Sequence, residues 1–290
     1  EVKVKPQLRE LLTQYGPVAL IWFDTPYSIN RNQSLELQQL VHELQPDCLV
    51  SGRIGNGVGD YGSLGDNQIP IGRVEGFWET PATMNDTWGF KHGDENWKSA
   101  ETLISLLVDL ASKGVNYLLN VGPTDEGIIP QPSVDRMAGI GKWLDANGEA
   151  IYGTTASPFP ISYHWGGVTE KANKLYLLIR EWPKAPFILH GLRNKVTHAY
   201  LLADAKTKLS ISQHRNKDLD HDILELTLPT KRPDQPVSVV VLELNGKPIV
   251  DPIPLQQPNG SVTLPSSAAN LHNKSETRPI EISRSGTTEN

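Results

Sequence analysis

The stretch VALIWFDTP, residues 18–26, decides how the first half of this 290-residue chain folds. Its first six residues are apolar without interruption, a pattern typical of a strand buried on both faces in a parallel sheet. Helical patterns flank the stretch, because leucines recur at helical spacing in residues 6–15 before it and in residues 34–44 after it. A strand between two amphipathic helices predicts β/α units and an α/β fold.

The same alternation continues to about residue 152. We predict strands over residues 48–51, 77–80 and 115–121, and helices over residues 99–113 and 133–147. This pattern gives about four β/α units, whereas a closed eightfold barrel needs eight units in about 250 residues. The first half therefore accounts for part of such a barrel and not for all of it.

The sequence pattern changes after Tyr152, where short alternating runs are separated by Gly, Pro, Asn and Asp. This spacing is typical of an antiparallel β-sandwich of about 90 residues. From Pro252 the chain becomes rich in Pro, Ser and Asn, with one strand-like fragment at residues 261–264. The strands that we predict for the sandwich span residues 175–180, 186–190, 197–202, 209–213, 223–228 and 237–244.

Composition excludes several classes of protein. A net charge of −6, a pI near 5.8 and the lack of a Lys/Arg block argue against a general nucleic-acid binder. No apolar run approaches the roughly 18–20 residues of a membrane helix. The single cysteine, Cys48, excludes an internal disulfide framework and a multi-cysteine zinc site. We therefore expect a globular protein without membrane or nucleic-acid partners.

Carboxylates follow the predicted strands at the edge where such sheets place catalysis. Asp24 ends the first strand, although a turn cap is an alternative role for it. Glu79 follows two aromatic residues, and an apolar environment raises a carboxyl pKa as a general acid requires. Asp60 and Asp66 lie in the glycine-rich loop between residues 52 and 76. Two carboxyls at one mouth suit glycoside hydrolysis, with one as nucleophile and one as acid/base.

Other side chains could bind a sugar. Arg53 follows the second strand and can donate to a sugar hydroxyl, although a surface salt bridge is an equal alternative. Trp78 and Trp88 could supply the flat faces on which sugars stack, whereas we expect Trp22 to be a core residue. No His, Asp or Glu spacing matches a zinc or calcium site, so we expect neither metal nor organic cofactor.

Five segments resemble the family 29 glycoside hydrolases, the α-L-fucosidases. The resemblance covers residues 5–155 closely and continues more loosely to about residue 250. The segments SKGVNYLLNVGP and WLDANGEAIYGT are specific to that family. The segments are GPVALIWFDTP (16–26), SGRIGNGVGDYGSLGDNQIP (51–70), FWETPATMNDTWGF (77–90), LLVDLASKGVNYLLNVGPTDEGIIP (106–130) and WLDANGEAIYGT (143–154).

The resemblance implies a retaining exo-α-L-fucosidase that removes terminal fucose from glycans. Asp24 matches the nucleophile, and Arg53 matches an arginine that contacts fucose. Trp88 matches an aromatic position near the C6 methyl group of the sugar. Glu79 matches one family assignment of the acid/base. Asp66 matches another, where many relatives carry Glu, so Glu79 ranks narrowly ahead of it.

The resemblance also predicts the organisation of the chain. We expect α/β plus all-β architecture: the C-terminal portion of a (β/α)8-type barrel over residues 1–155 and a β-sandwich over residues 156–252. Residues 253–290 form a linker and the truncated start of a further module. Because the first half of the family's barrel is missing, we expect a fragment whose sheet edges are covered by the missing half or by a second copy. The family implies a secreted, periplasmic or lysosome-like location, and a non-catalytic carbohydrate-binding remnant is the alternative function.

Overall fold

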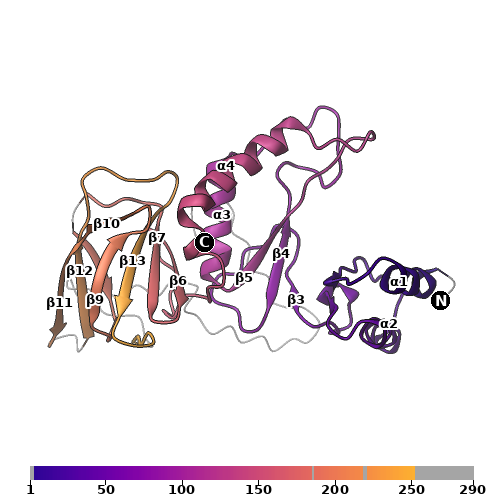
Figure 1. The fold of residues 1–290 in the computed structure, drawn as a ribbon, viewed down its shortest axis with the longest axis horizontal. Helices are drawn as coiled ribbons and strands as arrows, with labels where there is room; N and C mark the ends of the chain where they lie inside the picture. The colour runs from indigo at the N-terminus through magenta and orange to yellow at the C-terminus, as the bar shows by residue number, and fades with distance from the viewer. Residues whose placement is uncertain (1–2, 185, 218–220, 252–290) are drawn as a thin grey trace, which may run out of the picture.

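The computed structural model describes residues 3–184, 186–217 and 221–251. Helices and parallel strands alternate in its first half, as Figure 1 shows from the N-terminal end to α4. All four predicted helices and all four predicted strands of this half are confirmed, and β3 is an additional short strand. The elements are α1 (Val4–Gln14), β1 (Leu20–Ile21), α2 (Arg31–Leu44), β2 (Leu49–Val50), β3 (Gly62–Ser63), β4 (Trp78–Ala82), α3 (Ala100–Ser112), β5 (Val115–Leu119) and α4 (Gln131–Asn147).

Side-chain caps fix where two of these helices begin. Asn30 accepts a hydrogen bond from the Gln33 amide, while the Gln33 side chain accepts one from the Asn30 amide, which makes a capping box before α2. The Ser99 hydroxyl accepts a hydrogen bond from the Thr102 amide at 3.1 Å and starts α3. These caps satisfy amides that have no partner within the helix.

The described residues contain five parallel strands. β1 pairs with β2, and β3, β4 and β5 form a second parallel group. A single bridge between Ser51 and Tyr61 connects the two groups. Because the strands are parallel, the residues that follow β1, β2 and β4 emerge at one edge of the sheet.

The expectation that residues 18–23 form a strand buried on both faces is wrong. Leu20 of β1 lies opposite Leu49 of β2, and these side chains are 37% and 48% exposed. The other face is covered, because Ile21 and Val50 pack with residues of α1 and α2. The sheet therefore has one covered face and one face that the described residues leave open.

Two antiparallel sheets form the second half. One sheet has the strand order β10-β9-β13-β7-β6, and the other has the order β11-β12-β8. All six predicted strands are confirmed, whereas β6 and β10 were not predicted. The strands are β6 (Gly166–Lys171), β7 (Lys174–Ile179), β8 (Phe187–His190), β9 (Val196–Leu201), β10 (Asp204–Lys208), β11 (Ser210–Asn216), β12 (His221–Thr227) and β13 (Ser238–Leu244).

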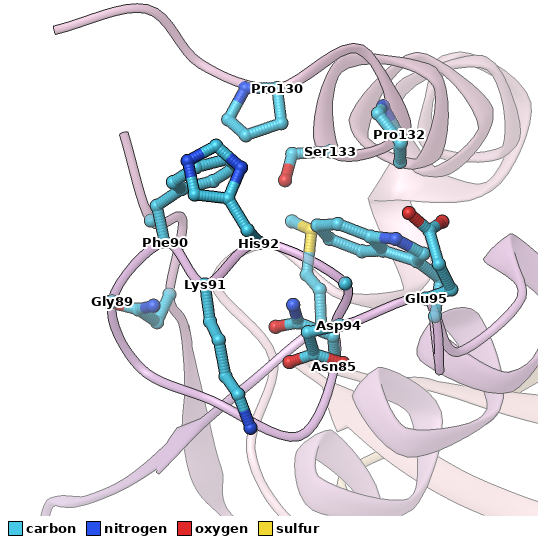
Figure 2. Close-up of a pocket in the computed structure, with 15 residues that line it drawn as sticks. Asn85, Gly89, Phe90, Lys91, His92, Asp94, Glu95, Pro130, Pro132 and Ser133 are labelled. Carbon is cyan, nitrogen blue, oxygen red and sulfur yellow. The ribbon is translucent and has the colours of Figure 1, made fainter. Parts of the chain in front are cut away.

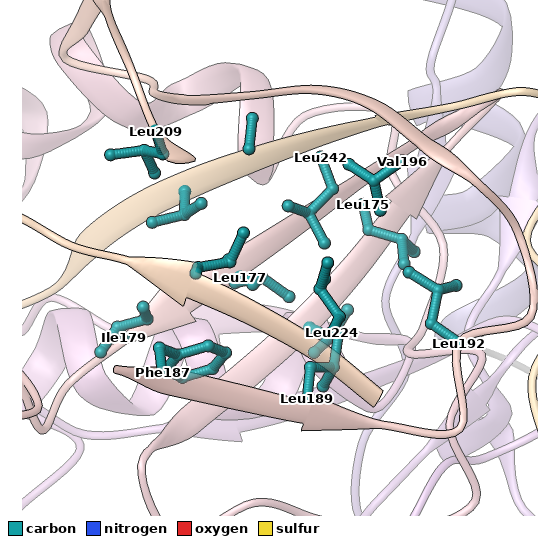
Figure 3. Packing of buried hydrophobic residues seen from close by; sticks show 14 of the residues in the cluster. Leu175, Leu177, Ile179, Phe187, Leu189, Leu192, Val196, Leu209, Leu224 and Leu242 are labelled. Carbon is teal, nitrogen blue, oxygen red and sulfur yellow. The ribbon is translucent and has the colours of Figure 1, made fainter. Parts of the chain in front are cut away.

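The five-stranded sheet is buried on both faces. On one face Leu177 of β7 packs with Phe187 and Leu224 of the three-stranded sheet (Figure 3). On the other face Leu178 packs with Leu103 of α3 and with α4. Figure 1 shows α3 and α4 between this sheet and β3–β5. This double burial explains why β7 and β13 are almost continuously apolar.

Two further predictions concern membrane helices and the C-terminal region. No helix within the described ranges is long and apolar enough to cross a membrane. The predicted fragment at residues 261–264, and with it the region 253–290, lies outside the described residues.

Candidate active site

Arg53 lies at the centre of the predicted site. The chain makes a short 3-10 helix, Gly52–Ile54, directly after β2, and this turn places Arg53 at the edge of the sheet. Its Nε donates to Ser63 Oγ at 2.9 Å, and its Nη1 donates to Asp24 Oδ1 at 3.1 Å. Its Nη2 donates to the Leu64 carbonyl at 3.1 Å and to Asp66 Oδ1. One guanidinium therefore joins the ends of β1 and β3.

The charge on Arg53 is stabilised by its two carboxylate partners. Partial burial opposes this charge, but the hydrogen bonds to Asp66 and Asp24 outweigh burial and raise the pKa of Arg53. The Arg53 side chain is 18% exposed, whereas those of Asp24 and Asp66 are 43% and 49% exposed. The carboxylates therefore remain accessible to a ligand while the arginine holds them in place.

Glu79, on β4, is linked to Arg53 through Trp22. It pairs in register with Ser63 on one side and with Asn116 on the other, and it is 7% exposed. Its Oε1 accepts a hydrogen bond from Trp22 Nε1 at 2.6 Å. Burial, and then the Glu79 carboxylate, raise the pKa of Tyr61 and keep that neighbouring phenol neutral.

Trp22 connects Glu79 to the arginine, so the expectation that Trp22 is a core residue is wrong. Its side chain is 38% exposed. The Arg53 guanidinium carbon lies 5.3 Å from the centre of its ring, within cation–π range. Residues 20, 22 and 24 share one face of an extended segment. The two-residue spacing between Trp22 and Asp24 therefore indicates in the sequence that both side chains lie on the same face of the sheet.

The other two predicted tryptophans are held by different partners. Trp78 packs its ring over Gly62, where an added Cβ would lie 2.3 Å from the ring, so this position requires glycine. Its Nε1 donates to the Glu75 carbonyl at 2.7 Å. Trp88 is 40% exposed, and its carbonyl accepts a hydrogen bond from Asn120 Nδ2 at 2.6 Å. The structure thus brings together Asp24, Asp66 and Arg53, with Glu79 linked through Trp22, whereas the contacts given for Trp78 and Trp88 are with other residues.

A cavity of about 200 Å³ lies next to Trp88. The loop before α3 and the first turn of α4 line it, and Figure 2 shows Phe90 and His92 on the loop and Ser133 on the helix. Asn120, which holds Trp88, also contributes to its wall. None of the predicted carboxylates lines this cavity, so it is separate from the Arg53 network.

The network provides the groups for acid–base and nucleophilic chemistry. Asp24 is an exposed carboxylate held by an arginine, and Glu79 is a buried carboxyl with one oxygen hydrogen-bonded. Across the described ranges, this network included, no three His, Cys, Asp or Glu side chains gather as a metal site would require.

Comparison with known proteins identifies the family. The alpha-L-fucosidase family model matches residues 1–149, about half of the chain. The tissue alpha-L-fucosidase of Bos taurus is 31% identical over 196 residues, which are 63% of this chain and 41% of that protein. The alpha-L-fucosidase of Dictyostelium discoideum is 31% identical over 213 residues, 68% of this chain and 46% of that protein.

Solved structures agree with the sequence relatives. An alpha-L-fucosidase from Vibrio sp. strain EJY3 superposes with a TM-score of 0.82 at 32% identity, covering 94% of this chain and 50% of that chain. Alpha-L-fucosidase isoenzyme 1 from Paenibacillus thiaminolyticus has a TM-score of 0.75 at 33% identity, covering 83% of this chain and 61% of that one. The chain spans about half the length of these relatives, and it belongs to the alpha-L-fucosidase family.

Proposed function

We propose that this chain is the C-terminal portion of a retaining exo-α-L-fucosidase that acts on fucosylated glycans. Residues 1–155 are then a partial (β/α)8-type barrel, and the antiparallel strands that follow are a β-sandwich. The observation that carries the proposal is the network in which Arg53 binds Asp24 and Trp22 connects Arg53 to Glu79.

The proposed reaction is a double displacement. The Asp24 carboxylate attacks the anomeric carbon while the carboxylic acid of Glu79 protonates the leaving oxygen. This step forms a glycosyl–enzyme ester and releases the rest of the glycan. Water then attacks the same carbon, its proton passes to Glu79, and Asp24 is released as a carboxylate.

Two observations favour Glu79 over Asp66 as the acid/base. Asp66 makes an ion pair with Arg53, which occupies one of its oxygens. Glu79 is buried and has no ion pair with any basic residue that the structure describes, and its second oxygen is not needed to hold Trp22. Asp66 is the alternative acid/base. In that role it would have to give up its ion pair with Arg53.

The first test is hydrolysis of an aryl α-L-fucoside by the full chain. We expect release of the phenol by the wild type and a loss of at least about a thousandfold for Asp24→Ala, because the nucleophile is removed. Asp145→Asn is the matched control, since Asp145 is an exposed acid on α4. Fucose binding without hydrolysis by the wild type would instead support the carbohydrate-binding alternative, which the short span of the chain relative to its relatives favours.

The second test separates Glu79 from Asp66. General acid catalysis matters most when the leaving group is a poor one. Glu79→Gln should therefore reduce hydrolysis of a methylphenyl fucoside far more than hydrolysis of a dinitrophenyl fucoside. Asp66→Asn should affect both substrates alike. The reverse result would assign the acid/base to Asp66.

A further inference from the structure

Trp22 has a contact that neither half of the proposed reaction uses. Its indole Nε1 donates to Glu79 Oε1 at 2.6 Å, a short hydrogen bond. The face of the same ring lies 5.3 Å from the Arg53 guanidinium carbon. Trp22 therefore contacts both the buried carboxyl and the arginine that holds Asp24.

We propose that Trp22 is a positioning residue that determines which oxygen of Glu79 carries the proton. The inference rests on the proposed role of Glu79 as acid/base. An indole N–H is a donor only, and in a carboxylic acid the carbonyl oxygen accepts hydrogen bonds better than the hydroxyl oxygen. The bond from Trp22 makes Oε1 the carbonyl oxygen, so the acidic proton resides on Oε2.

Burial makes this control effective. Glu79 is 7% exposed, so water competes weakly for Oε1 and the hydrogen bond is strengthened by its surroundings. Arg53 restricts rotation of the Trp22 ring, and Arg53 is itself held by Asp24, Ser63 and Asp66. The donor therefore keeps its direction through both steps, in which Oε2 first gives up a proton and then receives one.

The hydrogen bond itself can be tested without any substrate. The chain has seven tryptophans, so a ¹⁵N-labelled sample gives few indole N–H signals, and Trp22→Phe identifies the one from Trp22. We expect Glu79→Gln to shift this signal more than Asp66→Asn does, because only Glu79 accepts the indole proton. A Trp22 signal that does not respond to Glu79→Gln would overturn the proposal.

The positioning role is tested by the leaving group. We expect Trp22→Phe to lower kcat/KM about tenfold for a methylphenyl fucoside and less than threefold for a dinitrophenyl fucoside, since only the first needs a well-placed proton. Replacement of Trp22 by 3-benzothienylalanine, which exchanges only the N–H for sulfur, should give the same split. Trp182→Phe is the control, because the Trp182 indole donates to the Pro229 carbonyl at 2.8 Å in the antiparallel half.

The outcomes separate this inference from the proposed function. Equal losses on both substrates, or full activity of the benzothienylalanine protein, would refute positioning by the N–H even if the chain is an active fucosidase. If the wild type hydrolyses neither substrate, the proposed function fails for this chain, and the indole signal alone decides whether Trp22 holds Glu79.

Discussion

Arg53 illustrates how one residue can organise a site. It donates from three nitrogens to acceptors on Asp24, Ser63, Leu64 and Asp66. A lysine ammonium is a point charge on a flexible stem and cannot reproduce this planar fork.

We therefore predict that Arg53→Lys weakens inhibition by free fucose by at least about tenfold, the effect of losing one hydrogen bond of about 1.4 kcal/mol. The far-UV circular dichroism should stay unchanged. Arg193→Lys is the control, since Arg193 binds Asp251 in the antiparallel half. A fucose inhibition constant equal to that of the wild type would show that the arginine serves only the fold.

The residue types alone could not distinguish the roles of the two aspartates in the glycine-rich loop, residues 52–76. Asp60 and Asp66 each follow a glycine. In the structure Asp60 Oδ2 accepts from the Val50 amide at 2.7 Å and stabilises the end of β2, whereas Asp66 binds Arg53. The difference depends on contacts with residues 10 and 13 positions away, which no local pattern encodes. Asp24 and Glu79 could be selected because each ends or follows an apolar run.

At the scale of elements, two glycines of α4 differ in what surrounds them. A Cβ added at Gly141 would meet nothing within 4 Å, whereas one added at Gly139 would lie 2.9 Å from the Cβ of Ala100 in α3. Gly139 therefore permits close approach of α4 to α3.

We predict opposite effects of the same substitution at these positions. Gly141→Ala should raise the free energy of unfolding by about 0.5–1 kcal/mol, because alanine loses less conformational freedom in a helix. Gly139→Ala should lower it by about 1 kcal/mol through overpacking. Urea denaturation followed by circular dichroism measures both, and two equal effects would show that α3 and α4 do not pack as closely as described.

The helices and the apolar strands could be predicted because periodicity and caps are local signals. Of the three strands that were not predicted, β6 and β10 lack such signals. β6 begins with Gly166 and Gly167, and its glycine at 167 lies against Ser112 of α3. β10 has the sequence DAKTK and lies at the edge of its sheet, where burial is slight. Both strands are defined by their neighbours and not by their own composition.

At the scale of the whole molecule, the open face of the parallel sheet predicts self-association. Leu20, Leu49 and Leu118 are 37%, 48% and 41% exposed there. Exposed apolar side chains and unpaired strand edges favour contacts between chains.

We expect light scattering after gel filtration to give a mass above 32.0 kDa that rises with protein concentration. Leu49→Lys should reduce this association, and Ile188→Lys, at an exposed position of β8, should not. A monomer at every concentration would show that this face needs no partner.

The antiparallel half should lose stability in acid. His190 Nδ1 lies 3.0 Å from His221 Nε2, and burial followed by the charge of His221 lowers the pKa of His190. The unfolded chain therefore binds a proton more readily than the folded chain as pH falls below the ordinary histidine value of about 6.5. The stability is fully present above that pH and is lost below it. Urea midpoints at pH 7.5 and 5.5 should differ more for the wild type than for His190→Gln, and equal differences would contradict this assignment.

The apolar residues beneath α1 and α2 pack as a cluster of their own, and this separation has a consequence for how the protein opens. Asp24 and Arg53 depend on the cluster under α1 and α2, which does not include residues of α3, α4 or the antiparallel sheets. Cys48, 1% exposed, lies within that cluster. Local unfolding of α1, β1, α2 and β2, which share this cluster, would separate Asp24 from Glu79 while α3, α4 and the antiparallel sheets stay folded. A thiol reagent would label Cys48 at the rate of that opening, so activity and thiol protection should be lost together, at lower denaturant than the β-sheet signal.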